Sequence, residues 1–311
     1  MNETAGFRLP LNQRTVPNSE ERAYLMSDNP SNRSNSSVET GYLDVAGGRL
    51  YYEVTGAGYP LLLVHADVSD HSMWDEQVNA FAEQYRVVRF DKRGFGKTTS
   101  EDGPFSYRQD MAALLAHLGI EKAAILGLSN GGTQVVDFTL EHPELVDALI
   151  VVAGAASGDE QSFSNPTETE TALFSQYETL EEQKDYEGLV KLGVHVWCDG
   201  PNQPEGRAAA SVRERIAETL RNNYRLHQEK LEPQPLEPPA AGRLSEIHVP
   251  TLVIVGDFDE SGTVAAANTL AKGIPGAQHA VFQGVAHMVN MEQPERFNTL
   301  VLDFLAQALP Q

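Results

Sequence analysis

Residues 123–143 read AAILGLSNGGTQVVDFTLEHP, and they place a serine between glycines where two kinds of segment join. The run before Ser129 is short and apolar, which is typical of a buried strand, and the run after it has helical spacing. Gly127, Ser129 and Gly131 form a G-x-S-x-G pattern, in which a strained turn between strand and helix holds the serine hydroxyl clear of the backbone. A tight turn with a helix-capping serine is the simpler alternative.

The surrounding sequence alternates between buried strands and helices. Apolar runs predict strands at 61–64, 85–90, 123–127, 147–154 and 251–256, after a hairpin around Ala46 to Gly48. Helical segments are expected at 72–84, 107–118, 131–141, 264–273 and 294–308. Near-continuous apolar strands separated by helices predict an α/β fold, with a mostly parallel sheet covered by helices on both faces.

The chain divides into three regions by composition. Residues 1–38 are polar and rich in Ser and Asn, which predicts a flexible N-terminal tail. Residues 39–154 and 244–311 carry the strand and helix alternation and form the predicted core. Between them, residues 155–243 contain helical, charge-rich pieces and no strand-like run. That length is too great for a plain connection, so we expect a helical cap inserted over one end of the sheet.

Composition indicates which classes of partner and which cellular compartment to expect. The 311 residues carry a formal net charge of −21, which disfavours nucleic acid and anionic membrane surfaces as partners. The single cysteine, Cys198, can form neither an internal disulfide nor a cysteine-based zinc site. With no apolar run of membrane-spanning length and no apolar signal segment, we expect a cytoplasmic protein.

A serine hydroxyl becomes a good nucleophile only when a base removes its proton and an acid orients that base. Downstream, the stretch TLVIVGDFDE places Asp257 and Asp259 just past a predicted strand, and GVAHMVN places His287 in a loop before the last helix. Both stretches lie where strand ends meet loops, and the order serine, acid, histidine fits this pattern. We predict Asp259 as the orienting acid, and assign Asp257 to turn chemistry.

The negative charge that develops on an attacked carbonyl oxygen needs two N–H donors. Asn130, at the first turn of the helix, supplies one from its backbone. The second is expected from the backbone of Asp67, in the loop after the strand LLLV. His65, at the start of that loop, is expected to anchor it rather than to react.

These stretches resemble the α/β-hydrolase superfamily over about residues 40 to 311. The motifs that carry the resemblance are LLLVHA, FDKRGFGKT, GLSNGG, PTLVIVGDFD and GVAHMVNMEQPERF. Within the superfamily the chain is most similar to 3-oxoadipate enol-lactonases and carboxylesterases. That resemblance implies hydrolysis of a small-molecule ester or lactone through an acyl-enzyme, with no cofactor and no metal.

The chain departs from the family pattern in the loop that follows its first parallel strand. The family usually has His-Gly where this sequence has His65-Ala66. More importantly, Asp67 brings a carboxylate close to the expected oxyanion, which opposes the developing charge unless the side chain turns away.

The sequence specifies the substrate pocket and the reaction less closely than the triad. Met73, Trp74 and Met288 lie next to the catalytic loops and are candidate pocket residues, together with Trp197 of the cap. The same triad also serves C–C bond hydrolases and cofactor-free haloperoxidases, and the fold can serve as a non-catalytic ligand-binding protein. The sequence leaves the natural substrate and the oligomeric state open.

Overall fold

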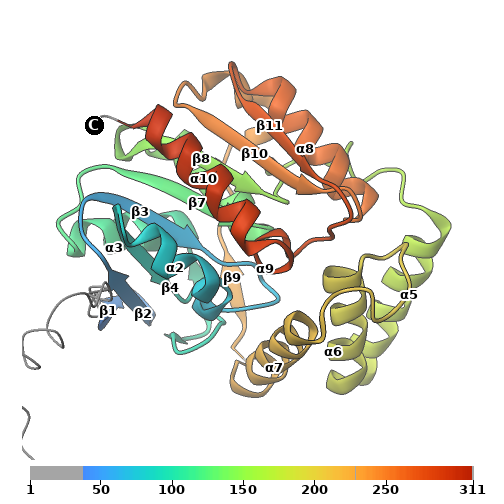
Figure 1. Ribbon diagram of the computed structural model, residues 1–311. Helices are drawn as coiled ribbons and strands as arrows, with labels where there is room; N and C mark the ends of the chain where they lie inside the picture. The colour runs from blue at the N-terminus through green and yellow to red at the C-terminus, as the bar shows by residue number, and fades with distance from the viewer. Residues whose placement is uncertain (1–37, 228, 310–311) are drawn as a thin grey trace, which may run out of the picture. The chain divides into compact units, whose positions relative to one another are not determined.

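The computed structural model describes residues 38–227 and 229–309, shown as the coloured ribbon in Figure 1. The predicted tail, residues 1–38, lies outside the described residues except for Val38. The α/β fold class predicted from the sequence is confirmed, with a mostly parallel central sheet and a helical insertion.

The sheet contains nine strands within the described residues, ordered β1-β2-β4-β3-β7-β8-β10-β11, with β5 beside β2. Their bounds are β1 Glu39–Val45, β2 Gly48–Thr55, β3 Tyr59–Val64, β4 Tyr85–Phe90, β5 Thr99–Ser100, β7 Ala123–Leu128, β8 Val146–Val152, β10 Thr251–Gly256 and β11 Gln278–Phe282. The hairpin of β1 and β2 is antiparallel, while β4, β3, β7, β8, β10 and β11 run parallel. Their carboxyl ends therefore meet at one edge, where the loops that follow them can converge.

Helices cover both faces of this sheet (Figure 1). One face packs against η1 His71–Trp74, α2 Asp75–Phe81, α9 Val289–Glu292 and α10 Pro294–Ala308. The other packs against α3 Tyr107–His117, α4 Asn130–Glu141 and α8 Ser261–Gly273. Shorter 3-10 turns are η2 Pro143–Leu145, η4 Ala240–Gly242 and η5 Leu244–Glu246.

The strand β3 shows why its sequence is continuously apolar. Leu61 and Leu63 belong to the hydrophobic cluster under α2 and α10, whereas Leu62 and Val64 belong to the cluster under α3 and α4. Side chains of a strand alternate between faces, so a strand covered on both sides needs apolar residues at every position. All four side chains are fully buried.

The insertion consists mainly of helices α5 Glu168–Gln183, α6 Tyr186–Val194 and α7 Ala210–Leu226, with a π-helical turn, His195–Asp199, after α6. These helices stand apart from the two helical layers in Figure 1. The expectation that residues 155–243 contain no strand is wrong in one place. The short strand β9 Leu231–Pro233 pairs in parallel with β6 Gly103–Phe105, a pairing too short and too polar to leave a periodic signal.

The helix α5 is fastened to the core at its first turn. Glu170, which is fully buried, completes a capping box with Thr167 and also accepts hydrogen bonds from the backbone N–H (2.8 Å) and hydroxyl (2.6 Å) of Ser261. Ser261 begins α8, two residues after Asp259. The insertion is thus tied to the loop at the end of β10.

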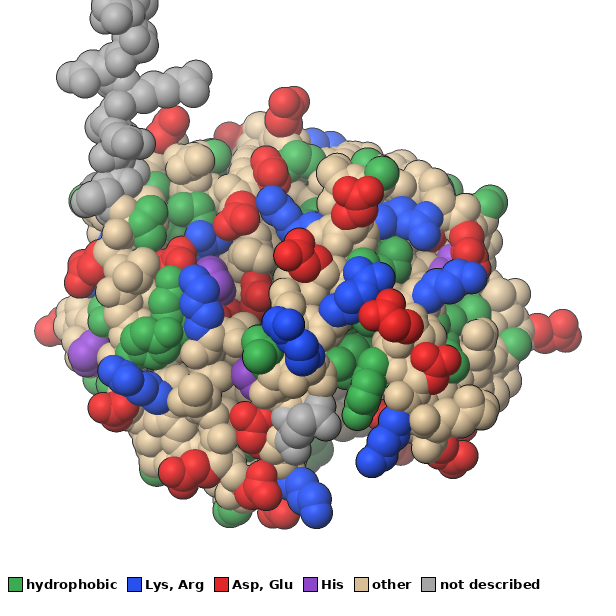
Figure 2. Space-filling model, turned by 90° about the horizontal axis from the view of Figure 1, so that it is seen from below, with side chains coloured by type: hydrophobic (Ala, Val, Ile, Leu, Met, Phe, Trp, Pro, Cys, Tyr) green, Lys and Arg blue, Asp and Glu red, His purple; other side chains and the backbone are tan. Residues whose placement is uncertain are grey.

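Charges of both signs are interspersed on the face shown in Figure 2, as solvated surfaces usually are. Buried charges are paired instead. His71, 7% exposed, contacts Asp91 at 2.7 Å and Glu53 at 3.4 Å, and Arg89 binds Glu53 at 2.6 Å. Burial alone would lower the pKa of His71, but the carboxylates of Asp91, Glu53 and Asp70 outweigh it and raise that pKa to about 9.

This raised pKa predicts a pH-dependent stability. Because the folded-state pKa of His71 lies above its unfolded value, its stabilisation is present in full below about pH 6.5 and is lost as the pH rises through 9. The substitution His71→Gln should lower the free energy of unfolding by about 1–3 kcal/mol at pH 6 and by clearly less at pH 10, measured by urea unfolding. His248→Gln, at an exposed histidine, is the matched control. Equal losses at both pH values would contradict the protonated ion network.

Candidate active site

Ser129 occupies a strained turn between β7 and α4. Its backbone lies at φ 60° and ψ −126°, and residues other than glycine rarely adopt a positive φ. The Ser129 N–H donates to the carbonyl oxygen of Val152 at 2.8 Å, and its own carbonyl accepts from Thr133 at 3.0 Å. The turn is thereby fixed from both sides, and the half-buried Ser129 is left at the carboxyl edge of the sheet. Such stored strain is characteristic of functional positions.

The two glycines of the pattern are required by close approach of the backbone. A Cβ at Gly127 would meet the carbonyl of Gly131, and one at Gly131 would meet the carbonyls of His65 and Val64. Both contacts would be shorter than the 3.0 Å below which real Cβ atoms essentially never approach. The elbow therefore packs its backbone directly on the loop after β3, because neither glycine has a side chain.

Asp259 and His287 form a buried hydrogen-bonded pair. The imidazole Nδ1 of His287 lies 2.8 Å from Oδ2 and 3.0 Å from Oδ1 of Asp259. His287 is 2% exposed and Asp259 is 5% exposed. An Nδ1–H that donates to a carboxylate leaves the lone pair on Nε2. Asp257, the alternative acid, instead accepts the N–H of Gly284 at 2.6 Å, which is turn chemistry.

The loop that carries His287 returns from β11 across the end of β10. Phe258 donates its N–H to the Val285 carbonyl at 2.9 Å. A Cβ at Gly256 would collide with the carbonyls of Val285 and Ala286. The absence of a side chain at Gly256 thus lets the loop reach back over β10 towards the elbow.

The topology places these parts on one edge. The strand β8 separates β7 from β10, and adjacent strands lie about 4.8 Å apart, so the two strand ends are about 10 Å apart. His287 follows β11, which lies beyond β10 in the sheet, and its loop folds back across the end of β10. Among the described residues, no hydrogen bond joins the Ser129 hydroxyl to His287. Nucleophile–base bonds are often long in enzymes without substrate and tighten when it binds.

The two expected oxyanion donors are the backbone N–H groups of Asp67, in the loop after β3, and of Asn130, the first residue of α4. Across residues 38–227 and 229–309, no backbone hydrogen bond occupies the N–H of Asp67 or Asn130. His65 anchors this loop from inside, because its Nδ1 contacts the Ala66 carbonyl at 2.7 Å and its Nε2 accepts the Lys92 N–H at 3.0 Å. Burial, helped by the Lys92 charge, lowers the pKa of His65 to about 3, so the ring stays neutral.

Of the candidate pocket residues, Trp197 contacts the proposed base directly. Its ring centroid lies 4.7 Å from that of His287. Met73 is fully buried, and its sulfur accepts the Ala66 N–H at 3.3 Å. Trp74 and Met288 are also fully buried, in the core cluster under α2 and α10. The geometry thus brings Trp197 to the site and places Met73, Trp74 and Met288 as packing around its loops.

Two charged residues near these loops receive no role from the sequence analysis. Lys92, only 1% exposed, pairs with the carboxylate of Asp67. Arg207 of the insertion pairs with Glu292 at 2.7 Å and donates to the Gly284 carbonyl at 2.9 Å. Glu292 in turn accepts the N–H of Ala286 at 2.8 Å, next to His287. The insertion is therefore bonded to the histidine loop.

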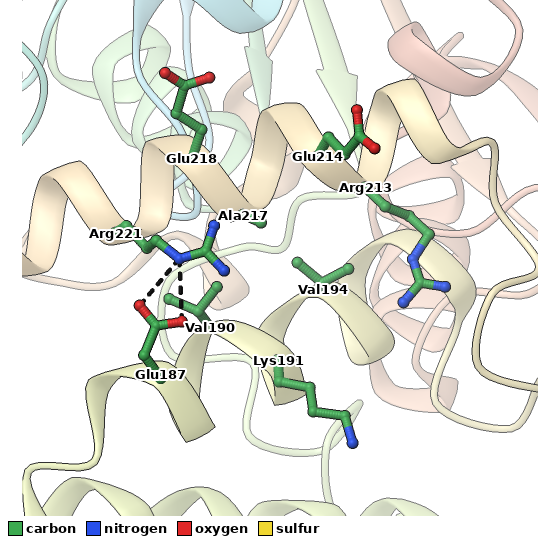
Figure 3. Close-up of a pocket in the computed structure, with 9 residues that line it drawn as sticks. All are labelled: Glu187, Val190, Lys191, Val194, Arg213, Glu214, Ala217, Glu218 and Arg221. Atoms are coloured by element: carbon green, nitrogen blue, oxygen red, sulfur yellow. Dashed lines mark hydrogen bonds and ion pairs between the residues drawn. The ribbon is translucent and has the colours of Figure 1, made fainter.

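Two further features of the described residues are a hollow in the insertion and a cluster of titratable side chains after β3 and β4. A hollow of about 800 Å³ lies between α6 and α7, lined by Val190, Val194 and charged side chains including the paired Glu187 and Arg221 (Figure 3). Asp70, His71 and Asp91 have the grouping of a metal site. Both oxygens of Asp91 are already engaged there, by N–H groups of His71 and by the Lys97 N–H at 2.8 Å.

Comparison with known proteins identifies the family. A family model of the alpha/beta hydrolase fold matches residues 59–196. A 2-hydroxy-6-oxononadienedioate/2-hydroxy-6-oxononatrienedioate hydrolase of Paraburkholderia phymatum is 34% identical over 279 residues, covering 83% of this chain and 91% of that protein. The chain belongs to the α/β-hydrolase family. A hydrolase with the same substrate names from Escherichia coli K12 is 29% identical, with the same coverage of 83% and 91%.

Solved structures agree with the fold. A hydrolase from Pseudomonas aeruginosa superposes with a TM-score of 0.69 at 24% identity, covering 88% of this chain and 99% of that one. The enol-lactonase of Burkholderia xenovorans gives a TM-score of 0.64 at 24% identity, covering 86% and 100%. The superfamily resemblance is confirmed, while the relatives above 30% identity are named for a different substrate from the lactones expected. None of the helices in the described residues has the length and hydropathy to cross a bilayer.

The crossing of the histidine loop over β10 generates a prediction. Gly256→Ala should lower the free energy of unfolding by about 1–3 kcal/mol, because the added methyl group must displace the backbone of Val285 and Ala286. Chemical denaturation measures this change. Gly242→Ala is the matched control, because a Cβ there meets nothing within 4 Å. Equal stability of the two variants would contradict the crossing described.

Proposed function

We propose that this α/β hydrolase uses Ser129 as nucleophile, His287 as general base and Asp259 as the acid that orients the imidazole. The observation that carries the proposal is the buried Asp259–His287 hydrogen bond at the edge where the strained Ser129 turn ends. His287 Nε2 removes the hydroxyl proton as Ser129 attacks a carbonyl carbon, and the resulting imidazolium is stabilised by Asp259. The proton then passes to the leaving group, and water attacks the acyl-enzyme by the same route.

The oxyanion of this reaction is held by the backbone N–H groups of Asp67 and Asn130. Both are free of other backbone partners within the described residues. Asn130 also begins α4, whose amino-terminal end favours negative charge. Donors fixed before the reaction stabilise the developing charge without reorganising during it.

As the leading candidate, we propose that the enzyme hydrolyses a C–C bond beside a ketone. The relatives at 34% and 33% identity are named as hydrolases of 2-hydroxy-6-oxononadienedioate, whose name contains no ester or lactone. Hydrolysis of such a chain must cleave a carbon–carbon bond, and the same serine triad can attack its keto group. This reading replaces ester or lactone cleavage as the leading one, because it follows the more similar relatives.

Ester or lactone hydrolysis is retained as the second candidate because of the charges around the site. A dioate substrate brings two carboxylates, yet Lys92 and Arg207, the cations described above beside the site loops, are already paired with Asp67 and Glu292. A neutral acyl substrate needs no further cation there. The two candidates therefore differ in the charge of the substrate as well as in the bond cleaved.

The test combines active-site labelling with a substrate panel. A fluorophosphonate should label the wild-type protein, and Ser129→Ala should abolish both labelling and turnover, with a loss of at least about 10³-fold in kcat. The panel comprises 2-hydroxy-6-oxo-dienoates with and without a second carboxylate, chromogenic esters and lactones, and peroxide with a halide acceptor. Ser245→Ala, at an exposed serine, is the matched control. Wild-type protein that is neither labelled nor active would instead indicate a ligand-binding protein.

A further inference from the structure

We propose that Lys92 is a positioning residue that neutralises Asp67 and fixes it beside the oxyanion hole, so that a carboxylate can occupy this loop without opposing catalysis. The inference rests on the proposed function, because it assigns a task to the residues around the proposed oxyanion donors. Lys92 acts only through Asp67 and is not itself required to touch the substrate.

Both carboxylate oxygens of Asp67 are held by cationic or amide donors. The Lys92 ammonium binds Oδ1, and the Asn130 side-chain amide donates to Oδ2 at 2.6 Å. Asp67 and Asn130 are the residues whose backbone N–H groups form the proposed oxyanion hole. Their side chains thus tie the two donors to each other across 63 residues of sequence.

Lys92 is held by its backbone, by two aromatic rings and by the Asp67 carboxylate. It follows β4, and its backbone N–H donates to Nε2 of His65, which anchors the same loop. Its ammonium lies 5.1 Å from the ring centroid of Phe95 and 5.4 Å from that of Tyr107. Aromatic faces attract a cation but cannot replace a counter-ion, so a lysine 1% exposed requires the carboxylate of Asp67.

The pair accounts for the charge that the sequence places on this loop. Desolvation opposes ionisation of Asp67, but Lys92 and the Asn130 amide outweigh it and lower the pKa of the carboxyl, so Asp67 stays ionised at neutral pH. The side chain of Asp67 is 44% exposed, whereas that of Lys92 is 1% exposed. The carboxylate of Asp67 therefore faces solvent, and the buried ammonium of Lys92 offsets its negative field.

The experiment separates charge compensation from packing by using three variants. Lys92→Met removes the ammonium and keeps a long apolar side chain, Asp67→Asn removes the carboxylate and keeps its shape, and the third variant combines both. Lys122→Met and Asp147→Asn, alone and combined, are the matched controls. Lys122 and Asp147 form an ion pair at 2.9 Å before β7 and at the start of β8, at the opposite edge of the sheet from Ser129. The readouts are the rate of Ser129 labelling by a fluorophosphonate, and kcat and KM for p-nitrophenyl butyrate.

Lys92→Met should lower the labelling rate and kcat by roughly 10- to 100-fold, with KM changed by less than about threefold, because an uncompensated carboxylate opposes the oxyanion but not ground-state binding. The double variant should recover to within about threefold of wild type, since it has no charge left to compensate. Asp67→Asn alone should reduce thermal stability, because it strands a buried ammonium. The control pair should leave kcat within about twofold of wild type.

Two results would overturn the inference while leaving the proposed function intact. One is a Lys92→Met variant that is folded by circular dichroism and labelled as fast as wild type. The other is a double variant as slow as Lys92→Met, which would show that packing rather than charge is lost. Failure of the wild-type protein to be labelled at Ser129 would instead overturn the proposed function, and the inference with it.

Discussion

Backbone-to-backbone contact at the carboxyl edge of the sheet is the constraint on which the candidate site depends. The elbow packs against the loop after β3, and the histidine loop packs across the end of β10, at distances that leave no room for a Cβ. Three glycines, Gly127, Gly131 and Gly256, provide that room. Because the close contacts are made by main chain, the positions of Ser129 and His287 are set by the sheet itself rather than by adaptable side chains.

The elements and the order of the site residues could be predicted from the sequence because their signals are local. Continuous apolar runs such as 61–64 identify strands covered on both faces, and a serine between glycines identifies the elbow. The position of Asp259 beyond the strand favours it over Asp257 as the orienting acid, and in the structure Asp259 is bonded to His287 whereas Asp257 accepts the N–H of Gly284 in a turn.

What could not be predicted depends on contacts between distant residues. The pairing of Lys92 with Asp67 joins two loops, and that of Arg207 with Glu292 joins the insertion to the histidine loop. The sequence around these four residues does not distinguish a buried ion pair from an exposed charge. The strand β9 was missed for a related reason, since its three residues become a strand only beside β6. The substrate is likewise set by the shape and charge of a cavity, which no linear pattern encodes.

The contact between Trp197 and His287 gives the protein an optical reporter of its own. The chain has two tryptophans, and the other, Trp74, is sealed in the core with no exposed surface. When the imidazole beside Trp197 acquires a proton, a cation appears 4.7 Å from an indole ring, which changes the surroundings of one emitter and not of the other. Under the proposed mechanism, intrinsic fluorescence therefore offers a way to follow the protonation of His287 during turnover of the unlabelled protein.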